Sequence, residues 1–277
     1  MTRPNHTRLL KCQQTSWALE AGVAADSAGY CTAPAANLPW LTSDTRADFA
    51  AADGHEFAAD GRRSKIAALH SSSALAVNVF DYWRVRDAGV VARILGLKGE
   101  VKDIRFEQRF RTGVGSRAPN LDVVIRTSTS LLAIESKFTE PFSARKKVGV
   151  QDKYVPSSGG LWSAHGLKGT QTAVEAIRNG ERFRYLDAPQ LLKHMLGLAQ
   201  CGQDWQLLLL WFVPSTAIGE EMSHEAARFR ALLGSDASRF AFKTYQDFWR
   251  ELRPLLSAEH MKYAAYIEQR YFAKPVA

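Results

Sequence analysis

The sequence of 277 residues is poor in cysteine and has no long hydrophobic run, and each absence argues against a class of protein. Its three cysteines, Cys12, Cys31 and Cys201, are odd in number and far apart, which disfavours a disulfide framework and a structural zinc site. The longest apolar run, at residues 207–213, covers seven residues, whereas a membrane helix needs about 20. No apolar stretch typical of a secretory signal follows the first residues. We therefore expect a protein of the reducing cytoplasm with no membrane partner.

Motifs of several enzyme classes are absent as well. The sequence contains no Walker loop, no H-E-x-x-H and no G-x-S-x-G, so these motifs support no assignment. The segment Gly113-Val114-Gly115 lacks the third glycine of a dinucleotide-binding loop, and we interpret it as a turn. The seven histidines are isolated by the standards of metal sites, and we expect His194 to be a packed or surface residue rather than a ligand.

What the sequence has in excess is positive charge. Its 36 Lys and Arg residues against 28 Asp and Glu give a net charge of +8, which favours a polyanionic partner such as nucleic acid or an anionic membrane surface. With 46% hydrophobic and 23% charged residues, the composition is that of a globular protein with a sizeable core. Disorder, collagen and coiled coil are thereby excluded as descriptions of the whole chain, and one elaborated domain is the default for this length.

Two regions differ in pattern along the chain. Residues 1–62 are rich in alanine and irregular, and we expect an N-terminal arm whose aromatic residues pack onto the body. Residues 63–277 form the main domain, with helical patterns at 65–85, 88–95 and 188–200, β-rich runs at 101–110, 121–126, 131–138 and 205–213, a basic stretch at 145–184 and mostly helical sequence at 223–272. This order predicts an α/β sandwich, with the aromatics near Phe240 as core around the C-terminal helices.

The two β-rich runs on either side of residue 128 predict a hairpin with a defined register. If residues 127–130 form the turn, Arg126 pairs with Leu131, and Asp122 lies directly opposite Glu135. Lys137 lies two residues further along its strand and therefore shares their face. The register that gathers an apolar surface on one face thus brings two carboxylates and one ammonium together on the other. A turn of odd length would break it.

Two carboxylates at this distance repel each other unless a cation lies between them. Mg²⁺ prefers oxygen ligands and typically takes one or two carboxylates together with water and phosphate oxygens. An ion held there could polarise a phosphodiester and lower the pKa of a bound water, while Lys137 orients that water or offsets charge on the phosphorane. The alternative is a surface ladder of ion pairs worth about 0–1 kcal/mol. The Glu-x-Lys pattern alone does not decide, because it also occurs at Glu100-Val101-Lys102.

Residues 119–125, Pro-Asn-Leu-Asp-Val-Val-Ile, and 133–138, Ala-Ile-Glu-Ser-Lys-Phe, resemble the signature of the PD-(D/E)xK nuclease superfamily. Residues 120–122 and 135–141 are similar to a largely uncharacterised branch of bacterial restriction-endonuclease-like proteins, and segments within 70–80 and 186–194 fit its flanking helices. The resemblance covers roughly residues 63 to 215. It implies an α/β fold with a restriction-endonuclease-like central mixed sheet flanked by helices, to which the N-terminal arm and the C-terminal helices are additions.

The resemblance also implies roles for individual residues. Asp122 and Glu135 would be metal ligands, the backbone carbonyl of Ser136 a further ligand, and Lys137 the residue that helps to position the nucleophilic water. The metal would be Mg²⁺, with Mn²⁺ able to substitute. The reaction would be hydrolysis of phosphodiester bonds, with DNA as the first choice of substrate.

One feature differs from the superfamily pattern and one position is open. Pro119 and Asp122 are separated by two residues instead of being adjacent. The family often places an additional acid on the first helix or strand, and Glu107 is our candidate, with Asp81 as the next choice. An ion pair between Glu107 and a neighbouring arginine is an equally good interpretation.

The basic stretch follows the proposed catalytic strand directly. Between residues 137 and 184, nine Lys and Arg stand against four acids, an excess that suits contacts with the phosphates of a nucleic acid. The candidates are Arg145, Lys146, Lys147, Lys153 and Lys168. Tyr154 and Trp162 could stack on exposed bases, although a solvated loop is the alternative for any single residue here. On the following helix, Gln190 and Lys193 could face the site, and a surface position is as well supported.

The combined interpretation is a Mg²⁺-dependent endonuclease of the PD-(D/E)xK type that cuts DNA in the cytoplasm, with a homodimer as an option for double-strand cuts. A non-catalytic nucleic-acid-binding module on the same fold is the first alternative. An α/β protein whose hairpin charges form only a surface ladder is the second. Metal-dependent cleavage that disappears in Asp122→Ala or Lys137→Ala would distinguish the first hypothesis from the others.

Overall fold

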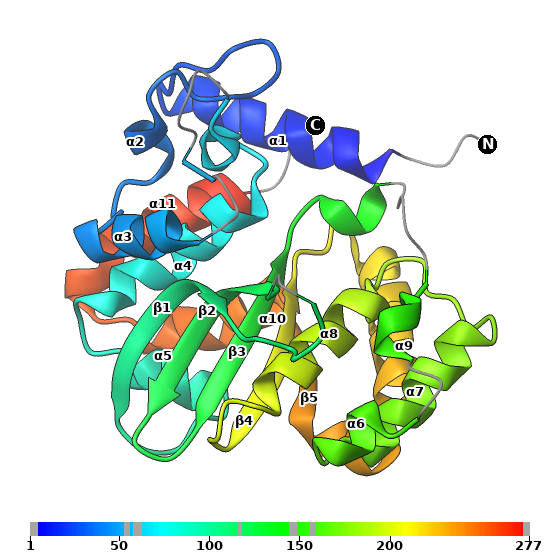
Figure 1. Cartoon of the computed structure of the whole chain (residues 1–277). Coiled ribbons are helices and arrows are strands. Elements are labelled where there is room, and N and C mark those ends of the chain that lie inside the picture. The colour runs from blue at the N-terminus through cyan, green and yellow to red at the C-terminus, as the bar shows by residue number, and fades with distance from the viewer. Residues whose placement is uncertain are drawn as a thin grey trace.

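The computed structural model describes residues 5–52, 56–57, 63–115, 118–143, 149–155 and 159–273. Its centre is a five-stranded sheet of order β1-β2-β3-β4-β5, with helices on both faces (Figure 1). The strands are β1 (Val101–Arg109), β2 (Asn120–Thr127), β3 (Leu131–Lys137), β4 (Trp205–Trp211) and β5 (Phe240–Thr244). The first three are antiparallel, whereas β4 runs parallel to both β3 and β5. The mixed α/β sheet flanked by helices is therefore confirmed.

The helices fall into three groups along the chain. The arm contains α1 (His6–Glu20), α2 (Pro34–Asn37) and α3 (Ser43–Ala51). The second group consists of α4 (Ser72–Arg84) and α5 (Gly89–Ile94), which precede β1 in the chain, and of α6 (Leu161–Ala164), α7 (Lys168–Arg178) and α8 (Ala188–Leu198), which lie between β3 and β4. The C-terminal part contains α9 (Thr216–Leu232), α10 (Tyr245–Leu252) and α11 (Met261–Ile267). In the described ranges no helix combines the length and the apolar character needed to cross a bilayer.

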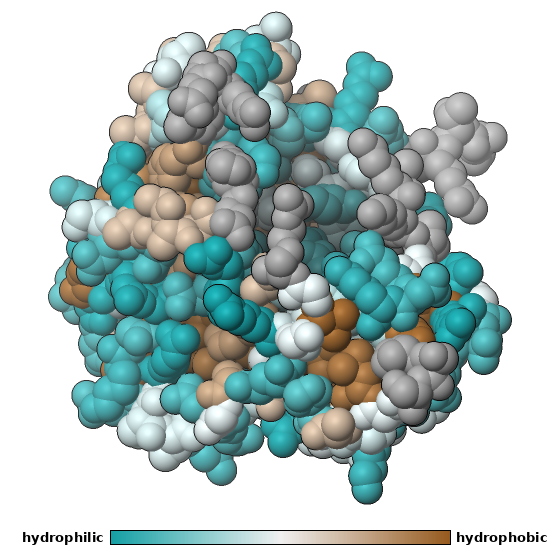
Figure 2. All heavy atoms as spheres, in the orientation of Figure 1, coloured by the Kyte–Doolittle hydropathy of each residue, from teal (hydrophilic) through white to brown (hydrophobic). Residues whose placement is uncertain are grey.

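Both faces of the sheet are buried, each under its own group of helices. Because side chains alternate along a strand, Val123 and Ile125 pack with α4, α5, α10 and α11, while Val124 packs with α7, α8 and α9. This double coverage explains why β3 is buried along almost its whole length and why β2 contains three successive buried apolar residues, Val123, Val124 and Ile125. On the side seen in Figure 2 hydrophilic residues predominate, as expected for a chain whose apolar residues fill two inner layers.

The hairpin has the register that the sequence predicts. Arg126 pairs with Leu131 and Val123 with Ile134, and residues 127–130 form the turn. The helix expected at 65–85 begins at Ser72, because the Ser71 side chain caps it by accepting a hydrogen bond from the Ala74 N–H. The serines at 71–73 therefore lie at the start of this helix.

Two elements were missed by the sequence interpretation. Phe240–Thr244, expected among C-terminal helices, is the edge strand β5, whose partner β4 lies 33 residues earlier at Leu207↔Phe240. The expected basic stretch contains α7, whose buried face is formed by Thr170, Ala173, Val174 and Ile177. Both elements are stabilised by contacts with residues remote in sequence. A strand of five residues, or a single apolar face of a helix, is by itself a weak sequence signal for secondary structure.

The arm contacts the C-terminal part of the described chain, and Figure 1 shows α1 and α11 on the same side of the sheet. Gln14 of α1 donates to the Arg270 carbonyl over 2.9 Å. The Arg270 side chain is fully buried and donates to Gln14 Oε1, to both oxygens of Asn37 and to the Leu69 carbonyl. A cationic side chain thus replaces its hydration by protein oxygens drawn from three separate segments. The division into an arm at 1–62 and a main domain at 63–277 stays a prediction.

Candidate active site

Four side chains selected from the sequence converge on one cavity of about 1010 Å³. They come from three adjacent strands: Glu107 from β1, Asp122 from β2, and Glu135 and Lys137 from β3. Other parts of the chain complete the lining, namely Glu56 of the arm, Ser72 and Ser73 of α4, and Gln190 and Lys193 of α8. The expectation that Gln190 and Lys193 face this region therefore agrees with their positions.

Asp122 and Glu135 are adjacent because they follow the last regular pair of the hairpin, Val123↔Ile134. The Asp122 carboxylate reaches across to β3, where Oδ2 accepts a hydrogen bond of 2.6 Å from the Ser136 N–H. In a strand the N–H and C=O of one residue point to the same side, so the Ser136 carbonyl is also directed towards β2. Two carboxylates and a backbone carbonyl thus lie at one end of the hairpin.

Glu135 is 2% exposed and is contacted from two directions. Lys137 Nζ lies 2.6 Å from Oε1, and His194 Nε2 of α8 lies 3.1 Å from Oε2. Burial alone would raise the pKa of Glu135, but the positive charge of Lys137 and the contact with His194 lower this pKa to about 2. Glu135 is therefore ionised at neutral pH.

Lys137 is surrounded by acids. Burial by itself would lower its pKa, but the negative charges of Glu135, Glu140 and Asp122 raise the pKa above the ordinary value. Glu140 is fixed in turn, because it accepts hydrogen bonds from the Phe138 N–H and from the Ser72 hydroxyl. Lys137 is consequently a permanent cation that donates hydrogen bonds.

The acids of the cavity raise each other's affinity for protons. Burial, and after it the negative charges of Glu135 and Glu107, raise the pKa of Asp122 well above its ordinary value. Burial, together with the charges of Glu56 and Glu135, raises the pKa of Glu107 to about 7, against the effect of a hydrogen bond from Asn120. A cation placed among these carboxylates would favour their charged forms.

Glu107 also has an unusual backbone. Among the described non-glycine residues it alone has a positive φ, of 49°. Such a conformation costs about 1–3 kcal/mol and persists where surrounding contacts enforce it. The residues before and after Glu107 both pair with β2, at Phe106↔Val123 and Gln108↔Leu121. In addition, Asn120 Nδ2 donates to Glu107 Oε2 over 2.9 Å. The strand is thus held while the Glu107 side chain reaches the cavity.

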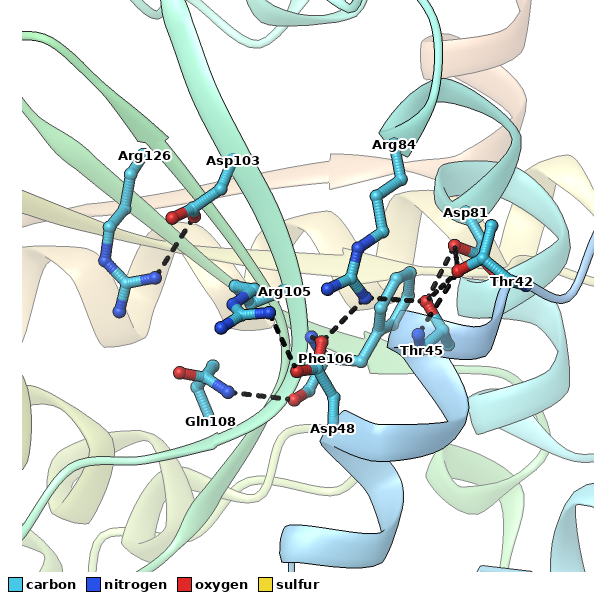
Figure 3. A network of polar contacts seen from close by, with 10 residues as sticks. All are labelled: Thr42, Thr45, Asp48, Asp81, Arg84, Asp103, Arg105, Phe106, Gln108 and Arg126. Atoms are coloured by element: carbon cyan, nitrogen blue, oxygen red, sulfur yellow. Dashed lines mark hydrogen bonds and ion pairs between the residues drawn. The ribbon is translucent and has the colours of Figure 1, made fainter.

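The arm holds β1 in place just before Glu107 (Figure 3). Asp48 of α3 accepts a hydrogen bond of 3.1 Å from the Phe106 N–H, and its carboxylate lies 2.7 Å from Arg84 and 3.3 Å from Arg105. Both Asp48 and Arg84 have only 7% of their side chains exposed. The polar cluster therefore fixes the backbone of β1 from the side opposite to β2.

Asp81, the second candidate for an additional acid, has a different position. Its carboxylate accepts hydrogen bonds from the Thr42 N–H and from the hydroxyls of Thr42 and Thr45, at 2.7–3.0 Å (Figure 3). These contacts fix the start of α3. Asp81 is absent from the described lining of the cavity, whereas Glu107 belongs to it.

The oxygen donors fit a hard divalent cation. In the described part of the chain, no three His, Cys, Asp or Glu side chains are grouped closely enough to form a metal cluster. The side chains next to Ser136 therefore offer two carboxylates, from Asp122 and Glu135. One or two carboxylates completed by water, a carbonyl or phosphate oxygens are the usual environment of Mg²⁺, whereas structural zinc sites use four Cys or His ligands.

The predicted phosphate-binding cations have varied outcomes. Arg145, Lys146 and Lys147 lie outside the described residues. Lys153 lies over the Tyr154 ring at 5.2 Å, and Lys168 begins α7. Neither belongs to the described lining of the cavity, so that their contact with nucleic acid stays a prediction.

The proposed base-stacking residues are not available for that role. Tyr154 is 4% and Trp162 2% exposed, and the Trp162 indole N–H donates to the Tyr154 carbonyl over 2.8 Å. Both rings belong to the core that covers the α8 face of the sheet. The expectation that they stack on exposed bases was wrong because α6 and α7, which bury them, were not anticipated.

The sequence interpretation missed two features of the site. Of the packed and surface positions considered for His194, the structure shows the packed one, which brings the ring to Glu135. A signal existed, since His194 follows the cavity-lining Gln190 by four residues and so lies on the same side of α8. Glu140 and Ser72 form the second feature, and no local pattern links residues 68 positions apart.

Comparisons with known proteins add one match. A family model described as "Restriction Endonuclease associating with ARP" matches residues 29–272. The match begins within the arm and includes the four residues selected from the sequence, Glu107, Asp122, Glu135 and Lys137. No curated protein and no solved structure matches the chain.

Proposed function

The chain belongs to the family Restriction Endonuclease associating with ARP, and we propose that it is a metal-dependent nuclease of the PD-(D/E)xK type acting on DNA. The observation that carries the proposal is the convergence of Asp122, Glu135 and Lys137 on one cavity. The proposed reaction is hydrolysis of a phosphodiester bond, in the cytoplasm. Where both strands are cut, we expect two copies of the chain to act together.

Three groups of this chain would hold the ion, which we propose to be Mg²⁺ or, in its place, Mn²⁺. They are the carboxylates of Asp122 and Glu135 and the carbonyl of Ser136. When bound, the ion would polarise the phosphodiester and acidify a water molecule. Asp122 would exchange its contact with the Ser136 N–H for the ion, whereas Glu135 is already ionised and held.

Lys137 acts in this proposal as a fixed donor. Because the surrounding acids raise the pKa of Lys137, it keeps its proton and does not serve as a general base. Glu135 fixes the ammonium at 2.6 Å, which leaves its other N–H groups for a water or a phosphate oxygen. Charge that develops on the phosphorane would be offset by this preorganised cation.

The lining of the cavity suits a nucleic-acid backbone. Lys193 of α8 provides a cation at the site, and Gln190, Ser72 and Ser73 provide uncharged donors. Such groups hydrogen-bond phosphates without reading a base sequence. The described lining also includes Asp187 and Glu56, so that a divalent cation would compensate acids as well as bind phosphate.

The test is incubation of the full chain with supercoiled plasmid and with linear duplex, in Mg²⁺, in Mn²⁺ and in EDTA. We expect metal-dependent cleavage that falls at least about 100-fold in Lys137→Ala, as for loss of a preorganised donor. The matched control is Lys102→Ala, because Lys102 forms the same contact with Glu100 at 2.6 Å but is 52% exposed. Salt-sensitive DNA binding without cleavage in any metal would refute catalysis and favour a binding module.

A further inference from the structure

An unusual polar contact lies next to the cavity, between His194 of α8 and Glu135 of β3. His194 is fully buried, and Glu135 is 2% exposed. Among the described residues, neither ring nitrogen of His194 nor Oε2 of Glu135 has a hydrogen-bond partner of standard geometry. Yet His194 Nε2 and Glu135 Oε2 are only 3.1 Å apart. Buried polar atoms are nearly always paired, so an unpaired set in contact requires an explanation.

The helix that carries His194 is held firmly against the sheet. Its N-terminus is capped by Asp187, whose side chain accepts from the Gln190 N–H. Further along, Gly197 allows a close approach to the residue after β1, because a Cβ at this position would lie 2.6 Å from the Phe110 carbonyl oxygen. The imidazole therefore approaches Glu135 from a fixed direction.

Glu135 is held between two elements. Its own strand supplies Lys137 to Oε1, and α8 supplies His194 to Oε2. Without His194 the carboxylate would be fixed at a single oxygen and could rotate about that contact. With both contacts its plane is defined, and each carboxylate oxygen still has a lone pair for a further ligand.

We propose that His194 is a positioning residue, which orients the Glu135 carboxylate towards the cavity through the contact of Nε2 with Oε2. The inference rests on the proposed function, since it assigns Glu135 to an ion. Partners behind a metal ligand fix its orientation, and their loss typically weakens metal binding about 10–100-fold.

The competing explanation is that His194 only fills space in the core. An apolar side chain of similar size would then serve as well. Loss of unpaired buried polar atoms would in that case leave the fold intact and leave the cavity unchanged. The two explanations therefore differ in metal binding and agree in the effect on stability.

The experiment compares His194→Gln with His194→Met in the full chain, because the two side chains have similar shapes and only glutamine can donate to Glu135. Mn²⁺ binding is measured by titration calorimetry, plasmid cleavage by gel, and folding by thermal unfolding. We expect His194→Met to bind Mn²⁺ about 10–100-fold more weakly and His194→Gln to retain most of the affinity. The control is Met195→Leu, at a buried neighbour on the same helix, which should change neither Mn²⁺ affinity nor plasmid cleavage.

Equal Mn²⁺ affinity in the methionine variant and the wild type would overturn the positioning role, and cleavage by the wild type would show that the proposed nuclease function survives it. A wild type that neither binds Mn²⁺ nor cleaves DNA would overturn both. Should the methionine variant fail to fold, His194→Leu takes its place, and the same comparison with His194→Gln decides.

Discussion

Replacement of Asp48 by alanine should destabilise the protein strongly, because one buried carboxylate serves three partners. It accepts from the Phe106 N–H and lies 2.7 Å from Arg84 and 3.3 Å from Arg105. Removal of one member of a buried ion pair costs about 3–5 kcal/mol, since the other charge remains uncompensated. Arg84 would keep a hydrogen bond of 2.8 Å to Thr45, which places the expected loss at about 3 kcal/mol, the lower end of that range.

Urea unfolding of the full chain measures this loss as a shift of the midpoint at unchanged slope. The matched control is Asp103→Ala (Figure 3). Asp103 is a β1 residue that also pairs with an arginine, Arg126, but its side chain is 41% exposed. An exposed pair contributes about 0–1 kcal/mol. If the two variants lost the same free energy, the argument from burial would be refuted. The double variant with Asp48→Leu and Arg84→Met should recover much of the loss, because no buried unpaired charge remains and Arg105, at 43% exposed, stays in contact with water.

Two further predictions concern pH and packing. Because burial raises the pKa of Glu107 to about 7, the folded chain holds a proton that the unfolded chain releases near pH 4.5, and this group therefore lowers the unfolding free energy as the pH rises between these values. Glu107→Gln should for this reason become more stable relative to the wild type from pH 5 to pH 8. A difference in unfolding free energy between the two proteins that stays constant over this range, in EDTA-containing buffer, would contradict the prediction. Gly169→Ala should lower the unfolding free energy by about 1–3 kcal/mol, because its Cβ would lie 1.9 Å from the Leu233 carbonyl oxygen. Gly149→Ala, with nothing within 4 Å, should leave the melting temperature unchanged.

The hairpin and its charged residues could be predicted because their determinants are local. A four-residue turn sets the pairing of Arg126 with Leu131, and strand geometry then places Asp122 opposite Glu135 without knowledge of any other element. Glu107, the candidate for an additional acid, lines the same cavity. The positive φ of Glu107 could not be predicted, since the contacts around it, from Asp48 to the Phe106 N–H and from Asn120 to the Glu107 carboxylate, involve residues remote in sequence.

The parts that escaped prediction depend on contacts between distant residues. The strand β5 has five residues and is defined by its pairing with β4, so that its aromatics are equally consistent with a helical core. His194 illustrates the same limit within the site. A packed or a surface position was expected for it, and its partner was not foreseen, because the separation between His194 and Glu135 is fixed by the way α8 packs on the sheet.

The arm and the cavity are physically coupled, although they are far apart in the sequence. Glu56 lines the cavity and contributes to the raised pKa of Glu107, while Asp48 holds the strand from which Glu107 projects. Two arm residues thus act on one acid, the first through its charge and the second through the backbone. Because backbone strain of about 1–3 kcal/mol must be balanced by nearby contacts, the conformation of Glu107 depends on the arm as well as on the sheet.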